Sequence, residues 1–143
     1  MTKIPTKNQI TEYKSPAVGH EITCVFIVED KPLLDNANGR LKKILGDALK
    51  SDKFNILGWV EHQFKPEGYS GVALLEESHA DVHTYPEHNS IALNMYSCRG
   101  EKDCKNTFDH FREHLGEHKI ISYREAKVPV TIEAAKKLGS FVK

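Results

Sequence analysis

Residues 74–87 decide how this chain is organised, and they read LLEESHADVHTYPE. The stretch completes an apolar, strand-like run at residues 71–75 and then turns abruptly polar. One serine, two histidines and four carboxylates lie between residues 76 and 87. From Asp81 onward an alternation with a period of two predicts a second extended segment. Polar groups held between two strands in this way are well placed to carry out chemistry.

The composition predicts one domain, residues 1–143, with enough apolar side chains to bury a core, since 39% of the residues are hydrophobic. The formal net charge is zero, which argues against a nucleic-acid or membrane-surface partner. Apolar runs are too short to span a membrane, and the polar N-terminus lacks the core of a signal peptide. Three cysteines are too few for a disulfide framework, so we expect a cytoplasmic protein.

The hydrophobic pattern predicts an α+β fold, a two-layer α/β sandwich. Strands are expected at 22–28, 54–64, 71–75, 81–87, 90–98 and 120–130. Helices are expected at 41–49, at 103–115 with Asp103 as its cap, and at 132–138, while residues 1–18 should form a loose arm. Because strands outnumber helices, a mainly antiparallel sheet with helices on one face is favoured. The other face of the sheet would still have to be covered by another surface.

Several short motifs, in order, carry a resemblance to a known family. They are residues 64–71 (FKPEGYSG), residues 77–79 (ESH), residues 83–87 (HTYPE) and Cys98. Together they resemble the prokaryotic S-adenosylmethionine decarboxylase proenzymes, pyruvoyl-dependent enzymes that cut their own backbone. The similarity extends from about residue 20 to about residue 125. It implies a homodimer, sheet to sheet or edge to edge, and a role in supplying aminopropyl groups for spermidine.

Decarboxylation of an α-amino acid needs an electron sink, usually a cofactor carbonyl that condenses with the substrate amine. A serine can generate such a carbonyl from the chain itself, by attacking the preceding carbonyl and then undergoing β-elimination. The resemblance assigns this to Ser78, with cleavage after Glu77 into chains 1–77 and 78–143. The covalent cofactor would be a pyruvoyl group derived from Ser78. Without the motif, Ser78 would be interpreted as a turn residue.

The resemblance also assigns the proton-transfer residues. His83, helped by Ser70, would promote self-processing, because an imidazole can take and return protons near neutral pH. Cys98 would protonate the α-carbon once CO2 has left, since a thiol can donate at that pH. Taken alone, His83 would be a strand histidine on a wet face and Cys98 a buried strand-end cysteine.

Substrate contacts are expected from aromatic and acidic residues. Phe64 matches the family's purine-stacking residue, Tyr85 stands where tryptophan is usual, and Glu87 matches a ribose-binding carboxylate. Aromatic faces suit both a purine and a sulfonium cation. Taken alone, Phe64 would be interpreted as a core residue.

Two departures keep the substrate open at this stage. Asn94 replaces an acidic residue, and Arg99 stands where the family has glycine after the cysteine. Arg99 would suit a substrate carboxylate, so an arginine or ornithine decarboxylase is the first alternative.

The second alternative is a metal-binding or regulatory module. His110 and His114 are one turn apart on the predicted helix, with His118 beyond, but no His-Glu-x-x-His pattern is present and no metal is expected. The third alternative, a processing-dead homologue that serves as a partner or activator subunit, conflicts with the retention of Ser78, His83 and Cys98. The remaining assignments are structural: Cys24 in the core, Cys104 without function, and His20, His62, His88, His114 and His118 on wet surfaces.

Overall fold

A computed structural model of the chain describes residues 14–100 and 103–143, so most of the arm expected at 1–18 lies outside the described residues. Its centre is a six-stranded sheet in which every neighbouring pair is antiparallel. The strands are β1 (Val18–Ile27), β2 (Ile56–Gln63), β3 (Tyr69–Leu75), β4 (Ser78–Tyr85), β5 (Ser90–Ser97) and β6 (Lys119–Pro129). Their order across the sheet is β2-β3-β4-β5-β1-β6, so β2 and β6 are the edges.

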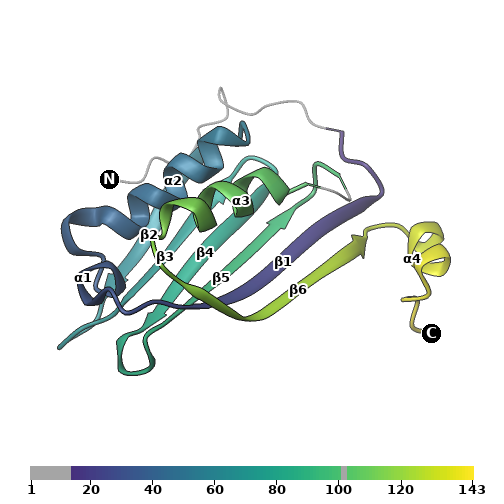
Figure 1. Ribbon diagram of the computed structural model, residues 1–143. Coiled ribbons are helices and arrows are strands. Elements are labelled where there is room, and N and C mark those ends of the chain that lie inside the picture. The colour runs from purple at the N-terminus through teal and green to yellow at the C-terminus, as the bar shows by residue number, and fades with distance from the viewer. Residues whose placement is uncertain (1–13, 101–102) are drawn as a thin grey trace.

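The helices lie mainly on one face of this sheet, which confirms the predicted α+β two-layer sandwich. They are α1 (Lys31–Leu34), α2 (Arg40–Ser51), α3 (Lys105–His114) and α4 (Ile132–Leu138), with 3-10 turns η2 (Ala37–Gly39) and η3 (Pro86–His88). Helices α2 and α3 run side by side over the sheet, and α4 lies beyond the end of β6 (Figure 1). The sequence analysis missed α1, and it placed the start of β1 four residues too late.

The core forms between the sheet and helices α2 and α3. Alternate strand residues point into it, because successive side chains in a strand face opposite ways. On β1 these are His20, Ile22, Cys24 and Phe26, all at most 4% exposed. The Phe26 ring packs 5.6 Å from that of Phe111 on α3, measured between ring centroids. The predicted core position of Cys24 is therefore confirmed.

The opposite face of the sheet, turned away from α2 and α3, is called here the open face. It carries Val60, Val72, Leu74 and Tyr85, which are 72%, 38%, 51% and 45% exposed. Val60 on β2 and Val72 on β3 are direct cross-strand partners, Leu74 lies two residues further along β3, and Tyr85 ends β4. The sandwich thus has one covered face and one face with large apolar groups in water.

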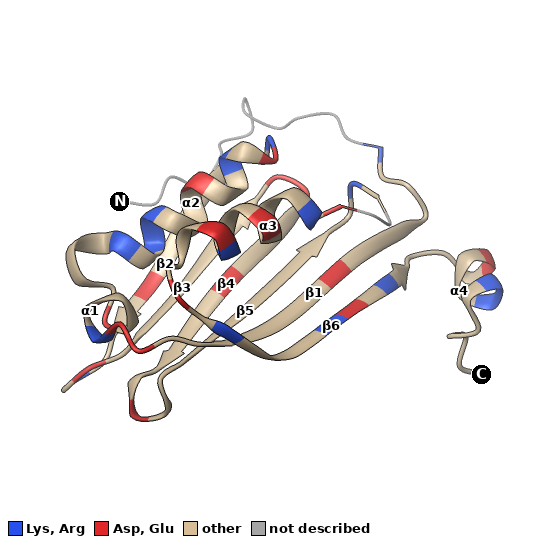
Figure 2. Cartoon of the chain, viewed as in Figure 1, with Lys and Arg blue, Asp and Glu red and all other residues tan. Residues whose placement is uncertain are grey.

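Charges of both signs are interspersed over the molecule. Helix α3 carries both acidic and basic residues, whereas the charged residues of α2 and β6 are mainly basic, with Asp47 and Glu125 as their acidic residues (Figure 2). Within residues 14–100 and 103–143, no helix has both the length and the apolar character needed to cross a bilayer.

Candidate active site

The predicted cleavage point lies in the bend that joins β3 to β4. Ser78 is the first residue of β4 and is 9% exposed, and its Oγ has no hydrogen-bond partner among the described residues. Buried hydroxyls are normally paired, so an unpaired one calls for a functional explanation. A serine nucleophile waiting beside the carbonyl it attacks is such an explanation.

The carbonyl group of Glu77, immediately before Ser78, receives two hydrogen bonds from a single residue. The backbone N–H of Cys98 donates to it at 3.2 Å, and the Cys98 thiol donates to it as well. Two donors aimed at one carbonyl oxygen stabilise the negative charge that develops there when its carbon is attacked. Burial also raises the pKa of the Glu77 carboxyl, with neighbouring Arg99 opposing. We call Glu77, Ser78 and Cys98 the cleavage cluster.

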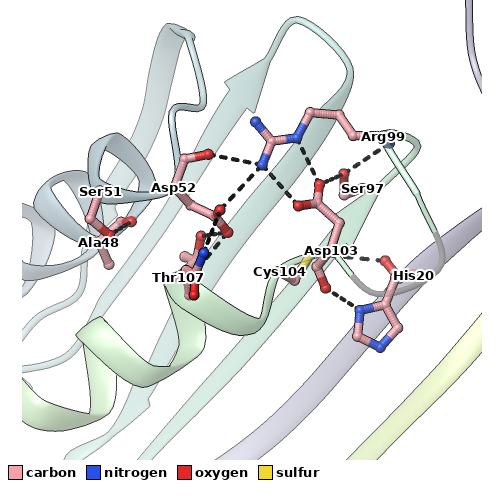
Figure 3. Close-up of polar contacts among 10 residues, drawn as sticks. His20, Ala48, Ser51, Asp52, Ser97, Arg99, Asp103, Cys104 and Thr107 are labelled. Atoms are coloured by element: carbon pink, nitrogen blue, oxygen red, sulfur yellow. Dashed lines mark hydrogen bonds and ion pairs between the residues drawn. The ribbon is translucent and has the colours of Figure 1, made fainter.

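Arg99 anchors the segment that carries Cys98 (Figure 3). Its Nε and Nη2 donate to the two carboxylate oxygens of Asp103 at 2.7 and 2.9 Å, and Nη2 also donates to the carbonyl of Asp52 at 2.9 Å. Its guanidinium lies 3.6 Å from the centroid of the Phe54 ring. The side chain that we considered for a substrate carboxylate is thus held by the protein's own groups, which gives it a positioning role.

Asp103 was predicted to cap α3, and that prediction is wrong. The residue at the cap is Cys104, whose φ is 74° and which makes no side-chain capping bond. The Asp103 carboxylate instead accepts from Arg99 and from the Ser97 hydroxyl. Although burial acts to raise it, these hydrogen bonds hold the pKa of Asp103 below its ordinary value.

His20 was expected on a wet surface, and that prediction is also wrong. It is 4% exposed, its Nε2 lies 2.9 Å from Glu125 Oε2, and its Nδ1 bonds the Asp103 carbonyl (Figure 3). It therefore ties β1 and β6 to the start of α3, beneath the loop that Arg99 holds.

A second group of predicted residues gathers on the open face. Ser70 Oγ lies 2.8 Å from His83 Nδ1, and the opposite ring nitrogen, Nε2, lies 3.3 Å from Asp81 Oδ1. Ser70 and His83 are direct cross-strand partners on β3 and β4. The pairing of serine with histidine that the sequence analysis proposed therefore has hydrogen-bonding geometry.

The expected binding residues surround that pair at the same end of the sheet. Phe64 follows β2 and is 46% exposed, Tyr85 ends β4 and is 45% exposed, and Glu87 is exposed in η3. Phe64 is thus available for stacking and is not a core residue. We call Ser70, His83 and these three residues the histidine cluster.

Within one chain the two clusters do not meet. Ser78 and His83 are five residues apart on β4, so their side chains point to opposite faces. At a rise of about 3.3 Å per residue they are separated by roughly 16 Å along the strand. Each chain therefore carries two halves of the predicted site, at opposite ends of the same strand.

The two histidines of α3 contact each other. The rings of His110 and His114 stack with centroids 4.1 Å apart, and His114 Nδ1 bonds the carbonyl of His110. Among the residues that the structure describes, no group of three or more His, Cys, Asp or Glu side chains is placed to hold a metal ion.

Sequence reasoning missed the acidic residues that hold the site together. Asp81 touches His83, Asp103 binds Arg99, and Asp52 binds both Arg99 and Thr107. A signal existed for Asp81, because residues two apart in a strand share a face. None existed for Asp52, which reaches Thr107 across 55 positions of sequence.

Comparison with known proteins agrees with this geometry. A profile of the S-adenosylmethionine decarboxylase family matches residues 23–127, which include both clusters. The S-adenosylmethionine decarboxylase proenzyme of Thermotoga petrophila is 28% identical over 120 residues, covering 79% of this chain and 92% of that protein. The same-named protein of Thermoplasma volcanium is 33% identical over 98 residues, covering 68% and 75%.

The fold is also found in a solved structure. The crystal structure of the adenosylmethionine decarboxylase from Aquifex aeolicus matches with a TM-score of 0.71 at 23% identity, over 80% of this chain and 93% of that chain. The match supports the antiparallel sheet with its helical layer. With a family profile that spans most of its length, this chain belongs to the S-adenosylmethionine decarboxylase family.

Proposed function

We propose that this protein is a pyruvoyl-dependent S-adenosylmethionine decarboxylase, a carboxy-lyase that matures by cutting its chain between Glu77 and Ser78. The products would be chains 1–77 and 78–143. One observation carries the proposal: the Ser78 hydroxyl is buried and unpartnered, beside a Glu77 carbonyl that already accepts two hydrogen bonds from Cys98.

The cleavage chemistry follows from these groups. Ser78 Oγ attacks the Glu77 carbonyl carbon while the peptide nitrogen leaves it, so the peptide becomes an ester. Removal of the α-proton of residue 78 then breaks its Cβ–Oγ bond and releases Glu77 as a carboxylate. The dehydroalanine that remains takes up water and loses ammonia, which leaves a pyruvoyl group. His83 would take and return the protons of these steps.

The residues around position 78 fit such a group, since a buried orphan hydroxyl marks the place where it forms. When present, the pyruvoyl carbonyl supplies the electron sink that decarboxylation needs. The Cys98 thiol lies against the Glu77 carbonyl and would return a proton to the substrate carbon after CO2 leaves.

The exposed aromatic residues favour a nucleoside substrate. Phe64 and Tyr85 are each nearly half exposed, and their rings suit a purine or a sulfonium cation, while the Glu87 carboxylate suits ribose hydroxyls. The alternative substrates, arginine and ornithine, are disfavoured because Arg99 is held by Asp103 and Asp52 and because the relatives are S-adenosylmethionine decarboxylase proenzymes.

We also infer that the site is completed between two copies of the chain. A two-fold interface through the open face would bury Val60, Val72 and Leu74, and by symmetry it would form two equal contacts between opposite ends of the sheets. The bend that carries the cleavage cluster of one copy would then lie at the end of the sheet beside the histidine cluster of its partner, and the Ser78 side chain, which points to the covered face in the uncut chain, would turn to reach it. This arrangement explains why the two halves are separated within one chain. A cytoplasmic role in spermidine synthesis completes the proposal.

A substrate panel tests the assignment. Purified, fully cleaved protein is incubated with carboxyl-labelled S-adenosylmethionine, arginine or ornithine, and released CO2 is counted. We expect release from S-adenosylmethionine alone, and its loss after treatment with borohydride, which reduces the carbonyl. Release from arginine or ornithine, with none from S-adenosylmethionine, would overturn the substrate assignment.

A further inference from the structure

Asp81 completes a line of three polar side chains on the open face. It lies two residues before His83 on β4, so both side chains emerge on the same side of the sheet. Its Oδ1 is 3.3 Å from His83 Nε2, and Ser70 Oγ is 2.8 Å from the other ring nitrogen. The Asp81 side chain is only 18% exposed, although ionised carboxylates usually lie in water.

The placement of Asp81 is not explained by folding. Burial raises the pKa of its carboxyl, and the neighbouring His83 and His79 only partly offset this. A carboxyl group whose pKa is raised by burial costs stability once it is ionised. The residue opposite it on β5, Asn94, donates to Thr23 at 2.7 Å, so its amide is engaged on the other side. Asp81 therefore interacts mainly with the two histidines of its own strand.

The contact has a direct consequence for the tautomer of His83. An ionised carboxylate only accepts hydrogen bonds, so it favours the tautomer in which Nε2, 3.3 Å from Asp81 Oδ1, carries the proton. In a neutral ring Nδ1 is then a bare lone pair, and the Ser70 hydroxyl must donate to it. Asp81 thereby favours one arrangement of protons along the line from the Ser70 oxygen through the ring to the carboxylate.

We propose that Asp81 is the positioning residue of self-processing: it fixes His83 in the Nε2–H tautomer, which keeps Nδ1 basic and orients the hydroxyl of Ser70. The proposal rests on the proposed function, because it assigns Asp81 a part in the same cleavage. A carboxylate that orients an imidazole in this way also stabilises the ring when it takes up a proton. Without it the ring could protonate at Nδ1, and the serine would turn its hydrogen away.

The first test is the rate of cleavage of freshly made precursor, followed by intact mass, for the wild type and for D81N, D81A and D81E. We expect D81N and D81A to cleave about 10- to 100-fold more slowly, because loss of the acid–base group itself costs about 100- to 10,000-fold and Asp81 only orients that group. D81E should recover part of the rate. The matched control is D47N, which removes an exposed carboxylate on α2 that pairs with Lys43, and it should cleave at the wild-type rate.

The second test reads the tautomer without any cleavage. In the S78A precursor, nitrogen NMR of the His83 ring should show the proton on Nε2, and in S78A/D81N it should show a mixture. Unfolding by urea should show that D81N is no less stable than the wild type. A wild-type cleavage rate in D81N, or an Nδ1–H ring in S78A, would overturn the proposal. A wild-type chain that never cleaves would instead refute the proposed function, while the NMR result would still test the link from Asp81 to His83.

Discussion

At the scale of single residues, Cys98 is a candidate for two roles, and the sequence alone indicated just one of them. The resemblance gave its thiol a role in protonating the substrate carbon. The structure adds that its thiol and its backbone N–H both donate to the carbonyl that Ser78 would attack. Under the proposed mechanism, the residue that follows β5 would serve both the making of the cofactor and its later use.

Substitution of Cys98 should separate these duties. C98A keeps the backbone donor and loses the thiol, so cleavage should slow by about 100-fold, at the low end of the loss of one oxyanion donor. C98S keeps a hydroxyl donor and should cleave within a few-fold of the wild type, yet inactivate quickly during turnover through wrong-site protonation. Intact mass gives the cleavage rates and CO2 release gives the turnovers. C98A cleaving as fast as the wild type would remove the thiol from the processing step.

The candidate site residues could be named where a sequence motif contained them, but the surroundings of those residues could not be predicted. Ser78, His83 and Cys98 were named from the sequence, but Asp81 was overlooked although its spacing from His83 placed both on one face. His20 was misplaced for a related reason. The alternation of β1 turns its side chain inward with those of Ile22 and Cys24. The polar ring can be buried there because Glu125 and Asp103 form hydrogen bonds with it.

At the scale of elements, the end of α2, the start of α3 and the loop after β5 are joined by two aspartates. Asp52, just after α2, accepts from the backbone N–H and the hydroxyl of Thr107 in the first turn of α3. Asp103 accepts hydrogen bonds from Arg99 in the loop and from Ser97 at the end of β5. The cap of α3 is thus supplied by a neighbouring helix, which local sequence rules could not predict.

Removal of Arg99 should loosen this junction. We expect R99A to lower the free energy of unfolding by about 1–3 kcal/mol, because it leaves partly buried carboxylate oxygens unpaired. R99K should recover little, since an ammonium cannot make the two-pronged contact. K43A, which breaks an exposed pair with Asp47, should change stability by no more than about 0.5 kcal/mol. Urea unfolding measures all three.

The stability that Asp103 contributes should depend on pH in a defined direction. Its folded-state pKa lies below the ordinary 3.8, so its contribution is complete above that value and is lost as the pH falls through the lower folded value. The difference in stability between wild type and R99A should therefore be constant near neutrality and shrink below about pH 4. A difference that stays constant into strong acid would contradict the ion pair as its cause.

At the scale of the whole molecule, the two-layer fold was predictable and the division of the site was not. Alternation and helical spacing predicted the sheet, its helical face and an uncovered opposite face. The order of the motifs along the chain, however, does not say how far apart their side chains lie in the fold. Only the strand geometry separates Ser78 from His83 by roughly 16 Å and by a face of the sheet, which points to a partner chain.

Mixing two inactive chains tests whether the site is shared. S78A lacks the nucleophile and H83A lacks the base, so neither should cleave alone. Co-expressed with different tags, they should form mixed dimers in which the H83A chain is cut, because its Ser78 meets His83 of the other copy. Mixed dimers captured through both tags, but with the H83A chain intact, would show that a shared site is wrong. As a control, V72D should weaken assembly, since Val72 lies on the open face.

Intact mass spectrometry of the freshly purified wild-type chain, beside S78A, decides most directly whether this protein makes its own ketone. We predict two wild-type fragments that meet between residues 77 and 78, the second blocked at its amino terminus by a pyruvoyl group, and a full-length S78A chain. A wild-type chain that stays full length after long incubation, with the mass of its unmodified sequence, would contradict the decarboxylase mechanism derived from Ser78.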